Sequence, residues 1–295
     1  MESYLAAIAI ITLIYTLLSL GLTLQYGLTG LINFGHVGFF AIGAYASALL
    51  AMKGVPLPLS FAAAAGLAAL AAWPIGLVSL RLRDDYFAIV TLGFSETVRI
   101  VITSERWLTN GVQGLPGVPR LYEGIGVGLN AALAVLATLV VATAIAAFMM
   151  RRISNSPFGR IIEAIRDNEE AVKALGKDPA RFKIQVLMVG AGLAGIAGAF
   201  YAHYITYIVP DQFIPLVTFY VWMAIIMGGV GRVSGAVVGT AILMLFLEGS
   251  RFLRDIVPGA SEVEMASVRI GAVGLALVLF TIYRPQGLMG DYTKR

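Results

Sequence analysis

The chain has 295 residues, of which 59% are apolar and only 13% carry a charge. About 25% of the residues of an ordinary soluble domain are charged, so this composition, with its mean hydropathy of +0.85, excludes such a domain. The chain has no cysteine, which excludes disulfides and thiolate metal sites. The net charge of +4 does not indicate a nucleic-acid partner, because the basic residues lie between apolar runs, where membrane topology accounts for them.

Apolar runs close to the ~20 residues that a membrane-spanning helix needs recur along the chain. The sequence therefore predicts an all-α, polytopic integral membrane protein with about eight to ten spans, forming a single transmembrane domain over residues 1–295. The first run has Glu2 ahead of it and no basic n-region, which indicates a retained span rather than a cleaved signal peptide. The proposed spans are residues 4–24, 32–52, 57–80, 86–104, 126–150, 184–208, 213–229, 234–253 and 267–283.

Two glycine-rich stretches, Gly27–Gly38 and Gly228–Gly239, resemble each other. Each precedes a span that runs outward, which suggests a weak internal repeat. Matching helix breaks in two halves of a transporter often form its binding path. For any single glycine, however, close helix packing is the simpler explanation.

Two spans depart from a plain apolar helix, and either could be broken or re-entrant. Residues 213–229 are short, with Pro215 near their start, and residues 86–104 contain Glu96 and Arg99. Charge inside a membrane is costly, and these two side chains, three residues apart, share one helix face. They could therefore form a structural ion pair, or Glu96 could belong to a translocation path.

Residues 105–125 form the main external segment, and their glycines and prolines predict turns rather than helix. In the later span 184–208, small residues recur at every fourth position, which predicts a face that packs closely on a neighbouring helix. The two rows of small residues are Gly190, Ala194, Gly198, Ala202 and Ala191, Gly195, Ala199.

The strongest interruption of the apolar pattern is residues 151–183, which hold eight of the 21 Lys and Arg residues and five of the 17 Asp and Glu residues. The basic excess predicts that this stretch is cytoplasmic. When the loops before and after this stretch are assigned to alternating sides of the membrane, 14 basic residues lie on the cytoplasmic side and six on the other. This distribution favours an odd number of spans with the N-terminus outside.

Within this stretch, residues 156–176 are expected to form one short amphipathic helix. Ser156 can cap it, with Pro157 in its first turn, and Gly176 can end it. Its polar face mixes both signs of charge, which favours a protein groove over a lipid surface as its partner. The expected ion pairs four residues apart are Arg166–Glu170 and Glu169–Lys173.

No catalytic constellation is recognisable in the chain. His36 and His203 are its only histidines, and neither has the spacing of a metal site or lies beside a phosphate-binding loop. His203, next to Tyr201 and Tyr204, is expected to be a packed or interfacial residue. The sequence therefore predicts a protein that is not an enzyme, holds no metal or cofactor, and cannot hydrolyse a nucleotide by itself.

Several motifs resemble those of a known family. Residues 170–176 (EAVKALG) resemble the EAA-x3-G signature of permease subunits of ATP-binding-cassette importers, with Val172 at its third position, although the proline of a following I-x-L-P motif is missing. The whole set resembles the branched-chain amino acid permease family, and within it the subunit usually paired with a second, homologous permease. The motifs are 33–50 (NFGHVGFFAIGAYASALL), 84–99 (DDYFAIVTLGFSETVR), 108–115 (LTNGVQGL), 156–176 (SPFGRIIEAIRDNEEAVKALG) and 228–243 (GGVGRVSGAVVGTAIL).

The resemblance implies a permease subunit of an importer for branched-chain or other neutral amino acids, in a bacterial or archaeal cytoplasmic (inner) membrane. Its implied partners are a homologous permease in a heterodimer, two cytoplasmic ATPase subunits that use ATP, and an extracytoplasmic substrate-binding protein facing residues 105–125. Related permeases carry urea, short amides or sugars, so these substrates stay open. The alternative from another class, an ion-coupled secondary transporter, predicts several intramembrane carboxylates, of which the spans offer Glu96 and Glu248.

By the same resemblance, residues 156–176 form the cytoplasmic coupling helix that docks on the ATPase. The residues expected to contact it or to set the shape of the dock are Gly159, Glu163, Arg166, Asp167, Glu170, Ala171 and Gly176. The residues assigned to the translocation path are Asn33, Gly35, His36, Tyr86, Thr91 and Glu96.

Overall fold

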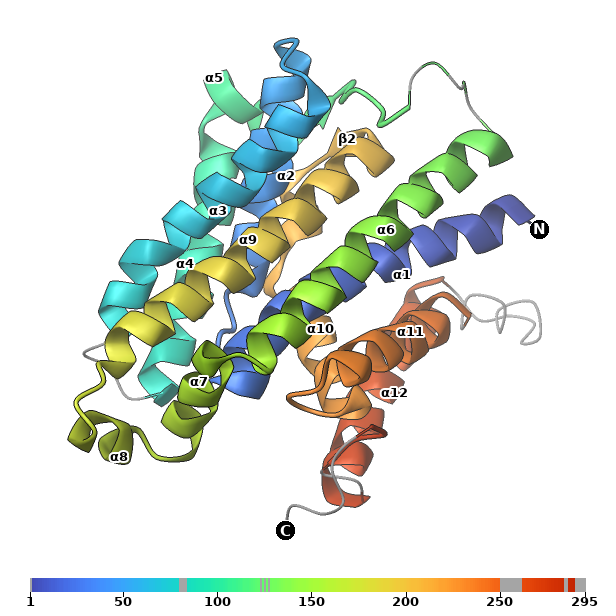
Figure 1. The fold of residues 1–295 in the computed structure, drawn as a ribbon. Helices are drawn as coiled ribbons and strands as arrows, with labels where there is room; N and C mark the ends of the chain where they lie inside the picture. Colours follow the sequence, from blue (N-terminus) through green and yellow to red (C-terminus); the bar gives the residue numbers. More distant parts are fainter. Residues whose placement is uncertain are drawn as a thin grey trace.

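The computed structural model describes residues 2–79, 84–122, 124, 126, 128–249, 262–283 and 286–289 of the chain. Long helices dominate these residues (Figure 1). Each predicted span contains one of them, which confirms the all-α, polytopic architecture. The long helices are α1 (Glu2–Leu22), α2 (His36–Met52), α3 (Leu57–Ser79), α4 (Asp84–Ser104), α6 (Leu129–Ser154), α9 (Pro179–Ile205), α10 (Pro215–Gly228), α11 (Val233–Gly249) and α12 (Glu262–Tyr283).

Helix lengths separate full spans from shorter elements. Within the described residues, six helical stretches are long and apolar enough to cross a membrane, while α2 and α11 are apolar but shorter. Of the two spans predicted to be irregular, α4 is one continuous helix, whereas α10 is a helix of 14 residues that follows a short 3-10 turn, η4 (Pro210–Phe213). Residues 80–83 between α3 and α4, residues 284–285 and the tail from residue 290 lie outside the described residues.

Helix α9 lies at the centre of the bundle, in contact with α1, α2 and α3. Small side chains allow these contacts. A Cβ added to Gly198 would overlap the carbonyl oxygen of Phe40 in α2, and one added to Gly195 would lie 2.5 Å from the carbonyl oxygen of Ala64 in α3. The predicted close packing of this span is therefore confirmed, and the neighbours it packs against belong to the same chain.

The external end is tied together by short elements. Residues 105–125 contain α5 (Arg106–Thr109), a 3-10 turn η2 (Gly111–Gln113) and a two-residue strand β1 (Leu115–Pro116). Strand β1 pairs antiparallel with β2 (Tyr207–Ile208), directly after α9. The glycine- and proline-rich segment is thus fixed to the end of the central helix, and Figure 1 shows β2 and α5 at the same end of the bundle.

The cytoplasmic stretch lies at the opposite end (Figure 1) and is not one helix but two, α7 (Pro157–Asp167) and α8 (Glu169–Ala174). The expectation of a single helix was wrong because of Asn168. Its backbone is extended (φ −159°, ψ 97°), and its side chain accepts a hydrogen bond from Ala171 N at 3.0 Å. An asparagine that bonds nearby backbone in this way caps a new helix instead of continuing the old one.

The other predicted features of this stretch are largely present. Ser156 Oγ accepts a hydrogen bond from Gly159 N at 3.2 Å and so caps α7, and Gly176 has a left-handed φ of +73° after α8. Glu169 and Lys173 form the predicted ion pair, at 3.3 Å. The expected Arg166–Glu170 pair is absent from the described residues: Arg166 pairs with Asp167 at 3.0 Å. Glu170 belongs to α8, beyond the break at Asn168, and pairs with Lys173 at 3.0 Å.

We predict opposite effects of the same substitution at two helical glycines. A Cβ on Gly43 in α2 would overlap the backbone of Gly195, whereas Gly66 in α3 has no atom within 4 Å of that position. Gly43→Ala should therefore lower stability by about 1–3 kcal/mol through overpacking. Gly66→Ala should raise it by up to about 1 kcal/mol through helix propensity. Thermal unfolding midpoints in detergent compare the two, and equal midpoints would contradict the packing described here.

Candidate functional site

The chain leaves helical conformation between α1 and α2. Helix α1 continues into a π-helical segment, η1 (Thr23–Leu28), and residues 29–35 are not helical before α2 begins at His36. His36 Nε2 lies 3.1 Å from the carbonyl oxygen of Leu18. Leu18 is about ten residues, or ~15 Å along the helix axis, before the end of the apolar stretch Glu2–Leu28. Residues 29–35 therefore fold back beside α1, and α2 begins inside the bundle.

Asn33 is the hub of this break and is fully buried. Its Nδ2 donates to Gln25 Oε1 at 2.8 Å, and its Oδ1 accepts from Gly35 N at 2.9 Å. Its carbonyl oxygen accepts from Trp222 Nε1 at 3.0 Å, and Gln25 Nε2 donates to the carbonyl oxygen of Leu187 at 3.2 Å. One asparagine therefore links η1 and the break to α10 directly, and to α9 through a glutamine.

Two threonines pair the backbone on the other side of the break. Thr91 Oγ1 in α4 accepts from Phe34 N at 3.1 Å, and Thr218 Oγ1 in α10 accepts from Val37 N at 3.0 Å. Gly35 lies so close to α4 that a Cβ would overlap the carbonyl group of Thr91. Non-helical backbone at membrane depth is tolerated only where protein groups or cavity water satisfy its polar atoms, and here side chains from two other helices do so.

His36 is the first residue of α2 and has no exposed surface. The carbonyl oxygen of Leu18 can only accept, so Nε2 carries the proton that the two atoms share. This tautomer leaves Nδ1 as an acceptor, and it has no hydrogen-bond partner among the described residues. The imidazole thus presents one unpaired acceptor within the bundle.

The remaining predicted path residues lie elsewhere on α4. Tyr86 is 59% exposed, and Glu96 Oε2 accepts from Arg99 Nε at 3.0 Å and Nη2 at 2.8 Å. The predicted ion pair is confirmed, while roles for Tyr86 and Glu96 in a path stay predictions. The predicted path residues that the structure brings together around the break are Asn33, Gly35, His36 and Thr91.

Sequence reasoning missed the partners that hold the break. Gln25 carried a usable signal, because it is an amide in an apolar run just before Gly27. Trp222 and Thr218 carried none, since tryptophan and threonine are unremarkable in a span and their partners lie 189 and 181 residues away in the chain. Such distant pairs follow from the packing of α10 on the break.

The second glycine-rich stretch forms the turn between α10 and α11, and it touches the first. A Cβ on Gly27 would lie 2.6 Å from Gly231 N. The two stretches that resemble each other in sequence thus meet at the cytoplasmic end of the bundle. Close approach explains both glycines, as the packing alternative proposed.

The predicted dock residues differ in accessibility. Gly159 is buried, and a Cβ there would overlap carbonyl oxygens at the end of α6. Glu163 is half-buried, whereas Asp167, Glu170, Ala171 and Gly176 are exposed. Leu175 beside them is 80% exposed. Gly159 therefore lies beneath the predicted dock, and α8 provides most of the open surface of these residues.

Arg166 is directed toward the bundle rather than only toward solvent. Its Nη1 donates to the carbonyl oxygen of Gly27 at 2.8 Å, and its Nε donates to Asp167 Oδ1 at 3.0 Å. Helix α7 is therefore bonded to the end of η1, directly below the break.

Helix α8 is held to α9 by charge. Glu169 Oε2 lies 2.7 Å from Lys183 Nζ, and Glu169 Oε1 lies 3.3 Å from Lys173 Nζ. Burial would raise the pKa of Glu169, but hydrogen bonds and attraction to Lys183 and Lys173 outweigh burial and lower that pKa below its usual range. Glu169 thus stays ionised at neutral pH and anchors α8.

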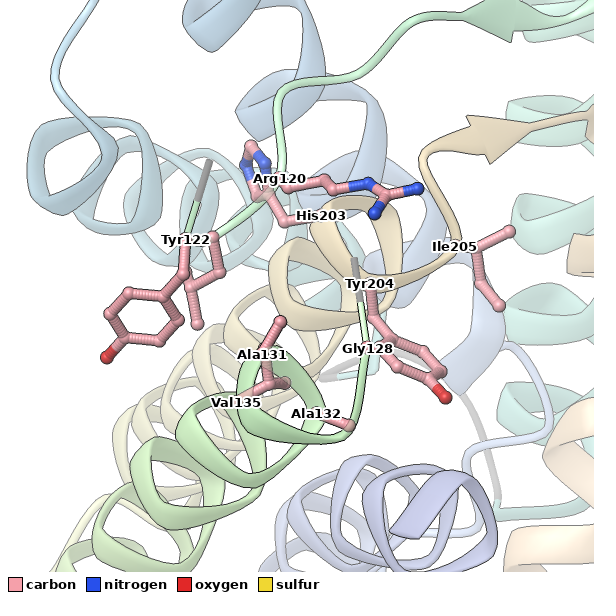
Figure 2. A pocket seen from close by; sticks show the side chains of 10 residues that line it. Arg120, Tyr122, Gly128, Ala131, Ala132, Val135, His203, Tyr204 and Ile205 are labelled. Carbon is pink, nitrogen blue, oxygen red and sulfur yellow. The ribbon is translucent and has the colours of Figure 1, made fainter. Parts of the chain in front are cut away.

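An external cavity of about 350 Å³ lies between the first turns of α6, the end of α9 and residues 120–122. In Figure 2, Tyr122 and Tyr204 lie on either side of the start of α6, with Arg120 and His203 along the opposite wall. His203 is 2% exposed and bonds Ser47 Oγ and the carbonyl oxygen of Pro119. It is therefore a packed residue, as expected, that fixes the external segment above α9.

Comparison with known proteins agrees with this arrangement. A sequence profile of the family described as branched-chain amino acid transport system / permease component matches residues 4–279. The chain belongs to this family. The match confirms the family expected from the motifs. No solved structure matches the chain.

Several curated relatives of this permease are known. The high-affinity branched-chain amino acid transport system permease protein LivM of Escherichia coli (strain K12) is 32% identical over 305 residues, which cover 96% of this chain and 69% of that protein. The probable branched-chain amino acid transport permease protein LivM of Methanocaldococcus jannaschii is 26% identical, covering 94% of this chain and 91% of that protein. The permease protein LivH of Escherichia coli (strain K12) is 25% identical, with coverages of 94% and 91%.

This member of the family is thus a permease subunit for transport and a multi-pass protein of the inner membrane. Its buried break lies where a transport protein would need polar groups, within the depth of its spans. Helices α7 and α8, the predicted dock, lie at the cytoplasmic end, and the 350 Å³ cavity lies at the other.

We predict that Asn33→Leu destabilises the permease. The substitution leaves the side-chain oxygen of Gln25 (Oε1) and the N–H group of Gly35 without their present partner. Each unsatisfied buried group costs about 1–3 kcal/mol. Thr143→Val is the matched control, because Thr143 Oγ1 is buried without a hydrogen-bond partner in the described chain and its loss should be neutral or stabilising. Thermal unfolding midpoints of the two variants in detergent should differ clearly, and a neutral Asn33→Leu would show that the network contributes nothing.

Proposed function

We propose that the chain is the permease subunit of an ATP-binding-cassette importer and forms, with a homologous permease, the path for branched-chain or other neutral amino acids. A separate ATPase drives alternation between outward-open and inward-open states. The observation that carries this proposal is the pair of capped helices α7 and α8, exposed at the cytoplasmic end and bonded to a polar break within the spans.

The surface of α8 suits a protein partner. It combines both signs of charge, at Glu170 and Lys173, with the exposed side chain of Leu175. A lipid surface favours a helix with a basic polar face, whereas a partner groove can match mixed charges and cover one leucine. We therefore assign residues 157–176 as the dock of the ATPase. ATP is used by that partner, and this chain binds no cofactor of its own.

The substrate assignment rests on the relatives. Their names describe branched-chain amino acid transport, and the chain resembles both LivM and LivH permease proteins, which supports a heterodimer of two homologous permeases. Urea, short amides and sugars are the alternative substrates of the same importer class. The external segment and the cavity beside Arg120 are assigned to contact with an extracytoplasmic binding protein.

An ion-coupled secondary transporter is the less favoured function. It would need intramembrane carboxylates free to bind and release an ion. Glu96 is instead paired with Arg99, whose Nη1 also lies 3.7 Å from Asp211. This charge cluster supports a structural role for Glu96.

We predict that Gly176→Leu weakens the association of the ATPase. Gly176 has a φ of +73° with open space around it, so a side chain there costs roughly 1–2 kcal/mol of conformational energy and reshapes the end of the dock. Gly54→Leu is the matched control, because Gly54 has a φ of +84° and equal space but lies in the turn between α2 and α3 at the external end.

The measurement is co-purification of the ATPase with each variant, together with uptake in vesicles. Gly176→Leu should reduce both by about tenfold, the factor that ~1.4 kcal/mol supplies, while Gly54→Leu leaves ATPase association unchanged. Unchanged association and uptake with Gly176→Leu would rule out this surface as the dock.

A further inference from the structure

The guanidinium group of Arg166 lies where three distant parts of the chain meet. Its Nη1 donates to the carbonyl oxygen of Gly27, at 2.8 Å and 139 residues away in sequence. Gly27 belongs to η1, and the first residues of the break lie on the same side: a Cβ on Gly30 would be 3.1 Å from Arg166 Cγ. Helix α7 thus touches both η1 and the start of the break through one side chain.

The turn between α10 and α11 completes the junction. A Cβ on Gly231 would lie 3.0 Å from the carbonyl oxygen of Gly27 and 3.8 Å from Arg166 Nη1. Gly30 and Gly231 have left-handed φ values of +80° and +83°, which L side chains rarely adopt. The two glycine-rich stretches therefore leave room for one arginine, and no side chain of their own fills that space.

The orientation of the guanidinium group is fixed by its neighbour. Asp167 Oδ1 lies 3.0 Å from Arg166 Nε and 3.0 Å from Arg166 Nη2, which leaves Nη1 to reach Gly27. Only the planar fork of arginine can hold a carboxylate with two nitrogens and a carbonyl with the third, because a lysine offers a single nitrogen atom. The full contact therefore requires arginine, whereas a lysine could replace only the bond to Gly27.

The junction continues into the buried break. Gly27 lies two residues after Gln25, whose side chain bonds Asn33, and Asn33 bonds Trp222 and Gly35 N. Hydrogen bonds and the segment 25–27 of η1 thus connect α7 to the start of α2. A displacement of α7 would move Gly27 and, through it, the backbone that Asn33 holds.

Arg151, in the last turn of α6 and outside residues 157–176, shows how an arginine without this role is placed. It is exposed, and its side chain forms no hydrogen bond or ion pair with another residue of the described chain. Basic residues at a cytoplasmic end are common for topological reasons alone. The geometry of Arg166 is different because its guanidinium bonds the bundle on one side and Asp167 on the other.

We propose that Arg166 is the positioning residue that couples movement of the dock to the buried break, rather than a contact for the ATPase. This inference rests on the proposed function, since it needs a partner that moves α7. In the absence of the bond to Gly27, the ATPase still binds and hydrolyses ATP, but its movement no longer reaches residues 29–35.

The test uses the complete importer in proteoliposomes, with Arg166→Ala, Arg166→Lys and the control Arg151→Ala. Three quantities are measured: the amount of ATPase bound, the rate of ATP hydrolysis, and the amino acid transported per ATP hydrolysed. Arg166→Ala should keep ATPase binding and hydrolysis but lower transport per ATP by about tenfold or more, as expected for loss of a hydrogen bond to a charged group. Arg166→Lys should restore part of the transport per ATP, because a lysine can reach Gly27 without the fork. Arg151→Ala should match the unchanged protein.

A second variant makes the test independent of whether Arg166→Ala folds. Asp167→Asn keeps Arg166 but weakens its fixed orientation, and it should give a smaller defect of the same kind. Unchanged transport per ATP in Arg166→Ala would overturn the proposal. If Arg166→Ala does not fold, unchanged transport per ATP in Asp167→Asn would overturn it. Loss of ATPase binding in Arg166→Ala would also overturn it, because Arg166 would then be a dock contact. Failure of the proposed function is distinguishable, because the unchanged protein would then show no ATP-dependent transport.

Discussion

The structure depends on one requirement: backbone that leaves the helix inside a membrane protein must find partners for its polar groups. Residues 29–35 meet this requirement beside α1, at a depth where the hydrocarbon core of a membrane offers no hydrogen-bond partners. Asn33, Thr91 and Trp222 supply these partners from the break itself and from two separate helices. The positions of α4 and α10 are therefore set by the break, and α9 is added to the same network through Gln25.

This arrangement also explains why small residues concentrate near the break. Gly35 against Thr91, and Gly27 against Gly231, are approaches that leave no room for a Cβ. A helix break held by side chains and close backbone contacts has discrete arrangements, unlike a continuous span, and packed elements of this kind can switch as units. The bond from Arg166 to Gly27 places the cytoplasmic helices in contact with that unit.

Features of the sequence that act locally were predictable. The nine apolar runs each became a helix, Ser156 caps α7, and Glu96 pairs with Arg99 three residues away. These outcomes depend on hydropathy, capping and helical spacing, which are properties of short segments. The family could also be recognised, because several motifs occur together in one chain.

Features that depend on distant contacts were not predictable. The bond from Trp222 to Asn33 and the meeting of Gly27 with Gly231 join segments far apart in the chain. The split at Asn168 was missed for a different reason, since the amphipathic pattern of residues 156–176 lies on both sides of Asn168 while the Asn168 side chain caps a new helix. The spacing of apolar residues alone does not show whether a capping side chain ends a helix or the helix continues.

ATP-dependent uptake is the most direct test of the account as a whole. Proteoliposomes would hold this chain, its homologous permease and the ATPase, with the binding protein on the opposite side and labelled leucine as substrate. The account predicts uptake when ATP is present on the ATPase side, and none when only a proton or sodium gradient is applied. Uptake driven by an ion gradient in vesicles that hold the permease without the ATPase would contradict it.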